Sequence, residues 1–362
     1  MAAADPERHA LERDLLALFA RGVETPLPET EFDSLARRLF AYQFARNAPY
    51  RAYCERRGAT PATVGHWQEI PAIPTAAFQA ADLTTVPPEA VRVIFRTSGT
   101  TAGEARRGRC LLPDTRLYDA SLLPNFQAHL LPDRARIRIH LLAPSSRHFP
   151  ESSLGHMASL VQARWGAAGS GIFWRESGPC FGCLASALRR AERDNEPVLL
   201  LATSWAMVLF LEACEKEGLT FRLPPGSRIM DTGGFKGRVR EVPQAELYAR
   251  YQDLLGVPDS HIVNEYGMTE MASQFYDPVL RGGRRRKVGP PWVRTLVVDP
   301  ETLAPVAEGE IGALRHYDLA NLHTVMAIQT DDLGVWEGDG FQILGRIAGA
   351  TPRGCSLATD LG

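Results

Sequence analysis

The chain has 362 residues, of which 45% are hydrophobic, and its 40 Lys and Arg nearly balance its 42 Asp and Glu. This length and apolar content suit one large globular domain or two ordinary ones, and a net charge of -2 excludes a whole-chain electrostatic footprint for nucleic acid or an anionic membrane. No apolar run reaches the ~20 residues of a membrane span, and the N-terminal residues lack the apolar core of a signal peptide. We therefore expect a soluble, cytoplasmic protein whose six scattered cysteines are reduced.

The N-terminal region is predicted to be helical. Apolar residues recur at helical spacing after Asp5, with a proline-containing break at Pro26–Pro28. The run Ile70–Thr75 is too rich in proline for a helix or a central strand, so we expect an extended connection there. We assign residues 1–85 to a helical segment packed on the core, and residues 86–362 to the core itself.

A loop rich in hydroxyls and glycines follows the predicted strand Val91–Phe95. Its glycines let backbone N–H groups turn toward an anion without a Cβ penalty, and its hydroxyls add donors, so the loop suits a phosphate. The next apolar run, Cys110–Leu112, predicts a second strand, so the loop joins two strands and differs from a P-loop, which opens a helix. The alternative is an ordinary Ser/Thr/Gly turn without a ligand. The loop residues are Thr97, Ser98, Gly99, Thr100, Thr101, Ala102 and Gly103.

Beyond this loop, strands alternate with helices, which predicts an α/β sheet with ligands gathered at the carboxyl ends of its strands. The predicted strands are Arg136–Ala143, Val198–Ala202, Ile229–Asp231 and Ile262–Val263, and the predicted helices run to Val161 and over Trp205–Cys214. We expect the basic run Arg281–Lys287 to be a solvated loop, and Trp292–Val298 and Ile311–Arg315 to be strands of a β-rich C-terminal portion. Cys180 and Cys183 lack a second cysteine pair at zinc spacing, which disfavours a metal site there.

The run Tyr266–Glu270 follows an apolar strand and contains a glycine, a hydroxyl and a carboxylate. Glu270 suits a hard cation such as Mg²⁺, Thr269 can donate to a phosphate, and Tyr266 can stack on a base. A nucleotide bound together with Mg²⁺ needs this combination of groups. The alternative is a capping arrangement at the start of a helix.

Two further motifs lie near the C-terminus. In Gln329–Gly334 an acidic pair precedes a predicted glycine turn, and a carboxylate there can accept hydrogen bonds from ribose hydroxyls. Gly345–Arg346 follows, with Arg353–Leu357 just downstream. Acidic turns are common in proteins, so these motifs gain meaning only in combination with the others.

In this order and at these separations, the four motifs resemble those of the adenylate-forming superfamily, which joins a carboxylic acid to AMP. The run Thr97–Thr101 resembles its phosphate loop, and Tyr266–Glu270 resembles its Mg²⁺ and adenine motif. Gln329–Gly334 resembles its ribose motif, and Leu344–Arg346 resembles its hinge motif. The resemblance implies the large α/β domain of that superfamily, here with a helical N-terminal segment and a β-rich C-terminal portion.

A closer resemblance, from about Leu39 to Leu357, is to the LuxE-like acyl-protein synthetases. The runs that carry it are Leu39–Tyr50, Ile70–Thr75, Met230–Arg238 and Arg353–Leu357. It implies that ATP and a fatty acid give acyl-AMP and pyrophosphate, and that the acyl group passes to a cysteine near the C-terminus and then to a partner reductase. Cys355 is the implied acceptor, and Arg353 could lower its pKa. The alternative is a small packed cysteine in the last strand.

The resemblance also implies a role for each motif residue. The β- and γ-phosphates of ATP would be held by Thr97, Ser98, Gly99, Thr100, Thr101 and Gly103. Adenine would be framed by Gly233, Gly234 and Tyr266. Thr269 and Glu270 would serve the phosphate and Mg²⁺, Asp332 would bind the ribose, and Arg346 would contact the nucleotide or the hinge.

The sequence departs from the superfamily pattern at several points. Ala102 breaks the usual glycine spacing of the loop, and arginines replace the lysine that often follows it, a role that an always-charged guanidinium can fill. We also expect the small C-terminal domain, which carries a catalytic lysine in most of the superfamily, to be absent. Lys236 and Arg238 are the candidates to supply the missing charge, and the alternative is that they are surface charges beside a glycine turn.

Two rival functions stay open at this stage. The first is activation of an aryl or other short acid, with transfer to coenzyme A, a carrier protein or an amine. The second is a non-catalytic protein that keeps the nucleotide pocket for binding or assembly. The chain length of the acid, the acyl acceptor and the oligomeric state do not follow from the sequence.

Overall fold

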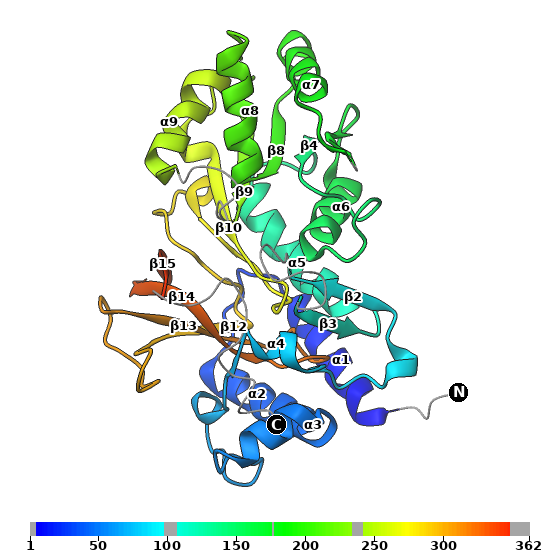
Figure 1. Cartoon of the computed structure of the whole chain (residues 1–362), viewed down its shortest axis with the longest axis vertical. Coiled ribbons are helices and arrows are strands. Elements are labelled where there is room, and N and C mark those ends of the chain that lie inside the picture. The colour runs from blue at the N-terminus through cyan, green and yellow to red at the C-terminus, as the bar shows by residue number, and fades with distance from the viewer. Residues whose placement is uncertain (1–4, 98–106, 176, 234–241, 348–362) are drawn as a thin grey trace. The chain divides into compact units, whose positions relative to one another are not determined.

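The computed structural model describes residues 5–97, 107–175, 177–233 and 242–347 of the chain (Figure 1). The chain divides into two compact units. The first unit comprises Met1–Asn125, Met268–Gln274 and Arg286–Gly362, and the second comprises Phe126–Gly267 and Phe275–Arg285. Each unit is therefore assembled from segments that are distant in the sequence.

Three helices begin the first unit: α1 (Pro6–Phe19), α2 (Glu29–Arg46) and α3 (Ala48–Glu55). Capping side chains set two of their starts, because the Asp5 carboxylate accepts from the N–H of Arg8 and the Asn47 side chain accepts from the N–H of Tyr50, each at 3.1 Å. Both helices also have a proline at their first turn, where no N–H is needed. The helices expected before residue 58 are thus present. Shorter helices follow at Trp67–Glu69 (η1), Ala77–Ala80 (α4) and Pro88–Ala90 (η2).

The first unit contains a five-stranded sheet in the order β1-β14-β13-β12, with β15 paired to β14. Its strands are β1 (Ile73–Pro74), β12 (Val293–Val298), β13 (Ile311–Asp318), β14 (Ala327–Glu337) and β15 (Gly340–Arg346). Only β1, short and proline-containing, pairs in parallel, which fits the expected extended connection. A separate antiparallel pair is formed by β2 (Val93–Arg96) and β3 (Arg109–Leu112). The boundary between the units falls within α5 (Arg116–Leu130).

The second unit contains a six-stranded sheet in the order β11-β10-β9-β8-β4-β5. The strands β4 (Arg138–Leu142), β5 (Gly171–Ile172), β8 (Val198–Thr203), β9 (Arg228–Thr232) and β10 (Ile262–Tyr266) run parallel, and β11 (Phe275–Tyr276) pairs antiparallel with β10. The continuous apolar run of β8 is buried, as expected for a parallel strand covered on both faces. The predicted α/β sheet is thereby confirmed.

The helices of the second unit are α6 (Ser153–Trp165), α7 (Phe181–Asp194), α8 (Ser204–Lys216) and α9 (Gln244–Leu255). A small hairpin of β6 (Trp174–Arg175) and β7 (Gly178–Pro179) precedes α7, and short helices lie at Asp259–His261 (η4) and Val279–Arg281 (η5). Helix α8 packs on β8, β9 and α9 and contributes Met207, Phe210 and Leu211 to the buried core. None of the helices in the described ranges combines the length and the apolar character needed to cross a bilayer.

Two sequence-based expectations about this part of the chain are wrong. Cys180 and Cys183, expected to be reduced thiols, form a disulfide. The basic run at 281–287, expected to be a solvated loop, is anchored: Arg285 donates to the buried Asp277 carboxylate at 2.6 Å, and Lys287 is buried. Carboxylates on neighbouring elements offset the cost of burying such a cation, and they cannot be recognised from a run of charges in one segment.

Candidate functional site

The predicted phosphate loop joins β2 to β3, as the sequence indicated. Thr97, which is buried at the end of β2, exchanges two hydrogen bonds with Gly108: its backbone N–H donates to the Gly108 carbonyl, and its hydroxyl accepts from the Gly108 N–H, both at 2.9 Å. The Arg107 side chain also donates to the Thr97 carbonyl at 2.6 Å. The two ends of the loop are therefore held together by main-chain and side-chain hydrogen bonds.

Within the first unit, the hairpin that carries this loop contacts Thr269 of the run Tyr266–Glu270. Cys110 of β3 donates its thiol hydrogen to the Thr269 carbonyl at 3.1 Å. No helix begins at Tyr266–Glu270, so the alternative interpretation as a helix cap is not supported. The fold thus brings together two motifs that are about 160 residues apart, a separation that only tertiary packing can close.

A cavity of about 20 Å³ lies beside this contact and is lined in part by Cys110, Thr269 and Glu270, and by Asp114 and His323. This volume has room for one water molecule or a cation of similar size. Neither ring nitrogen of His323 has a hydrogen-bond partner among the described residues, and burial lowers the pKa of its imidazole to about 4. The cavity is therefore too small to hold an acyl chain.

The segment Met268–Gln274 is held in place by two side chains that the sequence analysis did not identify. The buried Asp318 carboxylate accepts from the N–H groups of Ala272 and Ser273 and from the Ser273 hydroxyl. Burial raises the pKa of Asp318, and these hydrogen bonds counteract the rise. The Asn321 amide donates to the Glu270 carbonyl at 2.8 Å. The available signal was the polar pair Asp318 and Asn321, spaced Asp-x-x-Asn in the stretch before Gln329.

The predicted ribose motif lies in a strand, and the expected glycine turn is absent. Gln329–Gly334 belongs to the eleven-residue β14, with a register irregularity between Leu333 and Gly334 where β14 pairs with β15. Pairing with β13 on one side and β15 on the other overrides the local turn preference. Asp332 and Arg346 are register partners, and the Nε atom of Arg346 lies 2.9 Å from the Oδ1 atom of Asp332. The structure thus joins the ribose and hinge motifs by an ion pair.

In the second unit, three polar positions lie at the carboxyl ends of the adjacent strands β8, β9 and β10. Thr232 and Glu265 are register partners, and the Thr232 hydroxyl donates to the Glu265 carboxylate. Gly233 directly follows Thr232, and Tyr266 directly follows Glu265. Gly233 has a φ of +72°, a backbone conformation that favours glycine. Ser204, which begins α8 after β8, donates to the Gly233 carbonyl at 2.8 Å. Two of the three residues expected to frame adenine therefore share one edge of the sheet, where doubly wound sheets bind ligands.

Several predicted site residues lie outside the described residues. From the phosphate loop these are Ser98, Gly99, Thr100, Thr101 and Gly103. The others are Gly234, Lys236, Arg238 and Cys355, and their roles stay predictions.

The described residues can accommodate the expected Mg²⁺ through one carboxylate. Nowhere in the described ranges do three or more His, Cys, Asp or Glu side chains form a group suited to a metal. Mg²⁺ in nucleotide sites is usually held by one or two carboxylates together with phosphate oxygens and water. Glu270, which lines a pocket of suitable size next to Thr269, provides such a carboxylate.

The three free cysteines among the described residues are buried and poorly suited to nucleophilic chemistry. Burial raises the pKa of Cys54 to about 12 and that of Cys214 to about 11, and burial together with the nearby Glu270 charge raises that of Cys110. Since the thiolate is the nucleophile, these thiols are inert at neutral pH. They are core residues.

Known proteins resemble this chain along most of its length. The long-chain-fatty-acid--luciferin-component ligase of Aliivibrio fischeri is 24% identical over 340 residues, which cover 90% of this chain and 87% of that protein. The protein of the same name from Vibrio harveyi is 22% identical over 335 residues, with coverage of 90% and 86%. Among solved structures, an open conformation of 2-hydroxyisobutyryl-CoA ligase with 2-HIB-AMP and CoA aligns at a TM-score of 0.68 and 14% identity, covering 90% of this chain and 72% of that one.

The structural match confirms the predicted fold, which is that of the large domain of adenylate-forming ligases. It rests on arrangement in space, because 14% identity is too low to compare residue roles. The family described as acyl-protein synthetase, LuxE, matches residues 32–360, and the protein therefore belongs to this family.

Proposed function

We propose that the protein activates a long-chain fatty acid with ATP, forms acyl-AMP and pyrophosphate, and transfers the acyl group to its own Cys355. Membership of the LuxE family supports a ligase, and the two relatives are named for a long-chain fatty acid. The observation that carries the proposal is the contact between the β2–β3 hairpin and the Thr269 carbonyl. This contact supports the proposal because the hairpin carries the predicted phosphate loop between its strands and Thr269 directly precedes Glu270.

In the first step, an oxygen of the acid's carboxylate forms a bond to the α-phosphorus of ATP. The bond from that phosphorus to the bridging oxygen breaks, and pyrophosphate leaves with the electron pair. Because two anions must meet, the task of the protein is to position them and to neutralise their charge. Thr97 and the loop after it would hold the β- and γ-phosphates, and Gly233 and Tyr266 would frame adenine.

Glu270 would hold Mg²⁺, which when bound offsets the negative charge of the phosphates. Thr269 would donate a hydrogen bond to a phosphate oxygen, and Asp332 would accept hydrogen bonds from the ribose. Arg346, whose Nε atom lies 2.9 Å from the Asp332 carboxylate, would orient that carboxylate. Asn321 and Asp318 are positioning residues, because their hydrogen bonds to Glu270 and Ser273 hold the segment that carries Glu270.

In the second step, the Cys355 thiolate adds to the acyl carbonyl, and AMP leaves with the electron pair of its bond to the acyl carbon. The buried state of Cys54, Cys110 and Cys214 supports Cys355 as the acceptor. Onward transfer to a partner reductase and a cytoplasmic location stay predictions from the family resemblance.

The test of adenylation is acid-dependent exchange of pyrophosphate into ATP, measured with acids from acetate to long-chain fatty acids and with several aryl acids. We expect exchange to peak with a long-chain fatty acid and to fall about 100-fold or more in Glu270→Ala, the size of loss typical when charge stabilisation is removed. Glu301→Ala, which removes an exposed carboxylate from the same unit, is the matched control and should leave exchange unchanged.

The outcomes separate the proposal from its rivals. A peak with an aryl acid would redirect the substrate assignment to secondary metabolism, and ATP binding without exchange for any acid would indicate a non-catalytic nucleotide-binding protein. The thioester has a separate test, the intact mass after incubation with ATP and the acid. We expect one added acyl group that hydroxylamine removes, no addition in Cys355→Ser, and full addition in the neighbouring control Ser356→Ala.

A further inference from the structure

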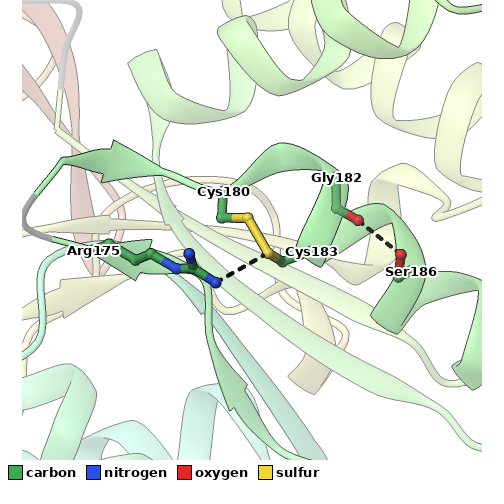
Figure 2. Close-up of a disulfide and its surroundings, with 5 residues drawn as sticks. All are labelled: Arg175, Cys180, Gly182, Cys183 and Ser186. Carbon is green, nitrogen blue, oxygen red and sulfur yellow. Dashed lines mark hydrogen bonds between the residues drawn. A yellow bond between two sulfur atoms is a disulfide. The ribbon is translucent and has the colours of Figure 1, made fainter.

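The disulfide between Cys180 and Cys183 lies at the start of α7 (Figure 2). Cys180 is the N-cap residue of that helix, and Cys183 lies in its first turn. The Nη2 atom of Arg175 lies 3.5 Å from the Cys183 sulfur. Figure 2 marks this contact with a dashed line. Both cysteines are partly exposed, in contrast to the three buried thiols, so a small reductant can reach them.

This disulfide contributes little as a cross-link. It encloses only two intervening residues, and the entropy that a cross-link removes from the unfolded chain falls with the length of the loop. Hydrogen bonds hold the same segment without the sulfurs: the Cys180 N–H donates to the Phe173 carbonyl at 2.8 Å, and the Ser186 hydroxyl donates to the Gly182 carbonyl at 2.9 Å. The local fold can therefore persist when the bond opens.

The surroundings of the pair stabilise a thiolate once the bond is broken. The first turn of a helix presents unpaired N–H groups and a partial positive charge, and a guanidinium adds a full charge next to Cys183. Both effects favour the reduced form, and thus an easily opened disulfide. The geometry points to a function beyond acid activation: Cys180–Cys183 is a thiol–disulfide exchange site whose co-reactant is a dithiol reductant.

The exchange proceeds in two balanced steps. A thiolate of the reductant attacks the Cys180 sulfur, the sulfur–sulfur bond breaks, and Cys183 leaves as a thiolate beside Arg175. The second thiol of the reductant then attacks the reductant sulfur that is bonded to Cys180, and Cys180 leaves as a thiolate. The reductant supplies two electrons and two protons and becomes a disulfide, and the protein gains two thiols.

A chain of contacts connects this site to the edge of the sheet where Gly233 lies. Trp174, paired with Pro179 in the hairpin just before Cys180, packs edge-on against Trp205 with ring centroids 5.3 Å apart. Trp205 is the second residue of α8, and its neighbour Ser204 donates to the Gly233 carbonyl at 2.8 Å. Pro179 directly precedes Cys180, so a shift of Cys180 when the disulfide opens would pass through these contacts to Gly233 while the hydrogen-bonded segment stays folded.

The exchange itself is tested on the full chain by alkylating free thiols after treatment with reduced or oxidised dithiothreitol and mapping them by peptide mass spectrometry. We expect Cys180 and Cys183 to be alkylated together only in the reduced sample. Arg175→Gln should slow reduction about fivefold or more by destabilising the departing thiolate, and Arg193→Gln, at the far end of the same helix, should not. Alkylation of Cys180 and Cys183 in the oxidised sample would overturn the exchange site. Equal rates of disulfide reduction in Arg175→Gln and Arg193→Gln would also overturn it.

The connection to Gly233 is tested by hydrogen–deuterium exchange of the oxidised and reduced protein, a readout that needs no nucleotide. We expect amides at residues 203–208 and 231–233 to exchange about fivefold faster on reduction, the lower end of ordinary coupling between sites. The double variant Cys180→Ser/Cys183→Ser should match the reduced protein under both conditions. Identical exchange in the oxidised and reduced wild-type protein would overturn the coupling.

An ATP titration of both redox forms extends the test and rests on the proposed function. If ATP binds, its Kd should be higher for the reduced protein than for the oxidised protein. Because coupling is reciprocal, bound ATP should shift the equilibrium between the two redox forms toward the oxidised form by the same factor. Equal Kd values would overturn the coupling to the nucleotide. If ATP does not bind at all, the proposed function fails, while thiol mapping and hydrogen exchange still decide the redox site.

Discussion

The side-chain amide of Asn321 donates one hydrogen bond of 2.8 Å to the Glu270 carbonyl and another of 3.1 Å to the Val325 carbonyl. Both bonds are buried, and they connect the segment that carries Glu270 to the chain leading into β14. The position of the carboxylate proposed to hold Mg²⁺ thus depends on a residue about 50 positions away in the sequence.

Replacing Asn321 should therefore affect both stability and adenylation. Asn321→Leu leaves two buried carbonyls without their donor, and we expect a loss of about 1–3 kcal/mol in the free energy of unfolding. Urea unfolding measures this loss, and pyrophosphate exchange should fall in the same variant while ATP still binds. Gln252→Ala, an exposed amide on α9, is the control and should change neither. Exchange at the wild-type rate in Asn321→Leu would contradict the positioning role.

The Asp332–Arg346 pair should matter more for the nucleotide than for stability. The Arg346 side chain is 42% exposed, so water screens the pair, and a double-mutant cycle with Asp332→Asn and Arg346→Gln should give a coupling under about 1 kcal/mol. Asp332→Asn should nevertheless raise the KM for ATP at least about tenfold, because a charged acceptor for ribose hydroxyls is lost. Steady-state kinetics measures this effect. An unchanged KM would remove Asp332 from the ribose site.

Gly334 is required for packing rather than for a turn. A Cβ at this position would lie 2.6 Å from the Gln342 carbonyl oxygen and 2.7 Å from a Leu314 methyl carbon. Gly334→Ala should therefore destabilise the first unit by about 1–3 kcal/mol, as other overpacking substitutions do. Thermal unfolding tests this, with Gly65→Ala as control, where a Cβ meets its nearest neighbour at an ordinary 3.7 Å. Equal unfolding temperatures for both variants would contradict the packing argument.

Stability should fall in mild acid because burial lowers the pKa of three histidines, His140, His316 and His323. Burial lowers the pKa of His140 and His323 to about 4 and that of His316 to about 3, from 6.5 in the unfolded chain. Between pH 6.5 and 4 the unfolded state therefore binds more protons than the folded state, and the free energy of unfolding decreases as the pH falls.

The expected loss at pH 5 is roughly 1–2 kcal/mol for each histidine, and urea unfolding at pH 7 and pH 5 measures it. His323→Gln should reduce this pH dependence by about a third, since one of the three contributions is removed. His9→Gln, at an exposed position of α1, should leave it unchanged. A wild-type stability that is flat from pH 7 to 5 would contradict the assignment of buried neutral imidazoles.

Much of the fold was predictable because its signals are local. The run Val198–Ala202 is apolar throughout, so it can only be a strand covered on both faces, and the structure buries it as β8. The hydroxyls and glycines after Val91–Phe95 likewise indicated a loop between two strands, which β2 and β3 confirm. The turn predicted at Gln329–Gly334 was wrong. Pairing of this segment with two neighbouring strands outweighs the local preference of Asp and Gly for turns.

By itself, the sequence determined which residue types stand together in each motif, and from them the family and the chemistry of a nucleotide site. Only the tertiary structure decided how the motifs are supported: Cys110 against Thr269, and Asn321 against Glu270. The physical reason is that propensity and periodicity act over a few neighbouring residues. A hydrogen bond between residues 50 or 160 positions apart depends instead on how whole elements pack, which no single stretch of sequence encodes.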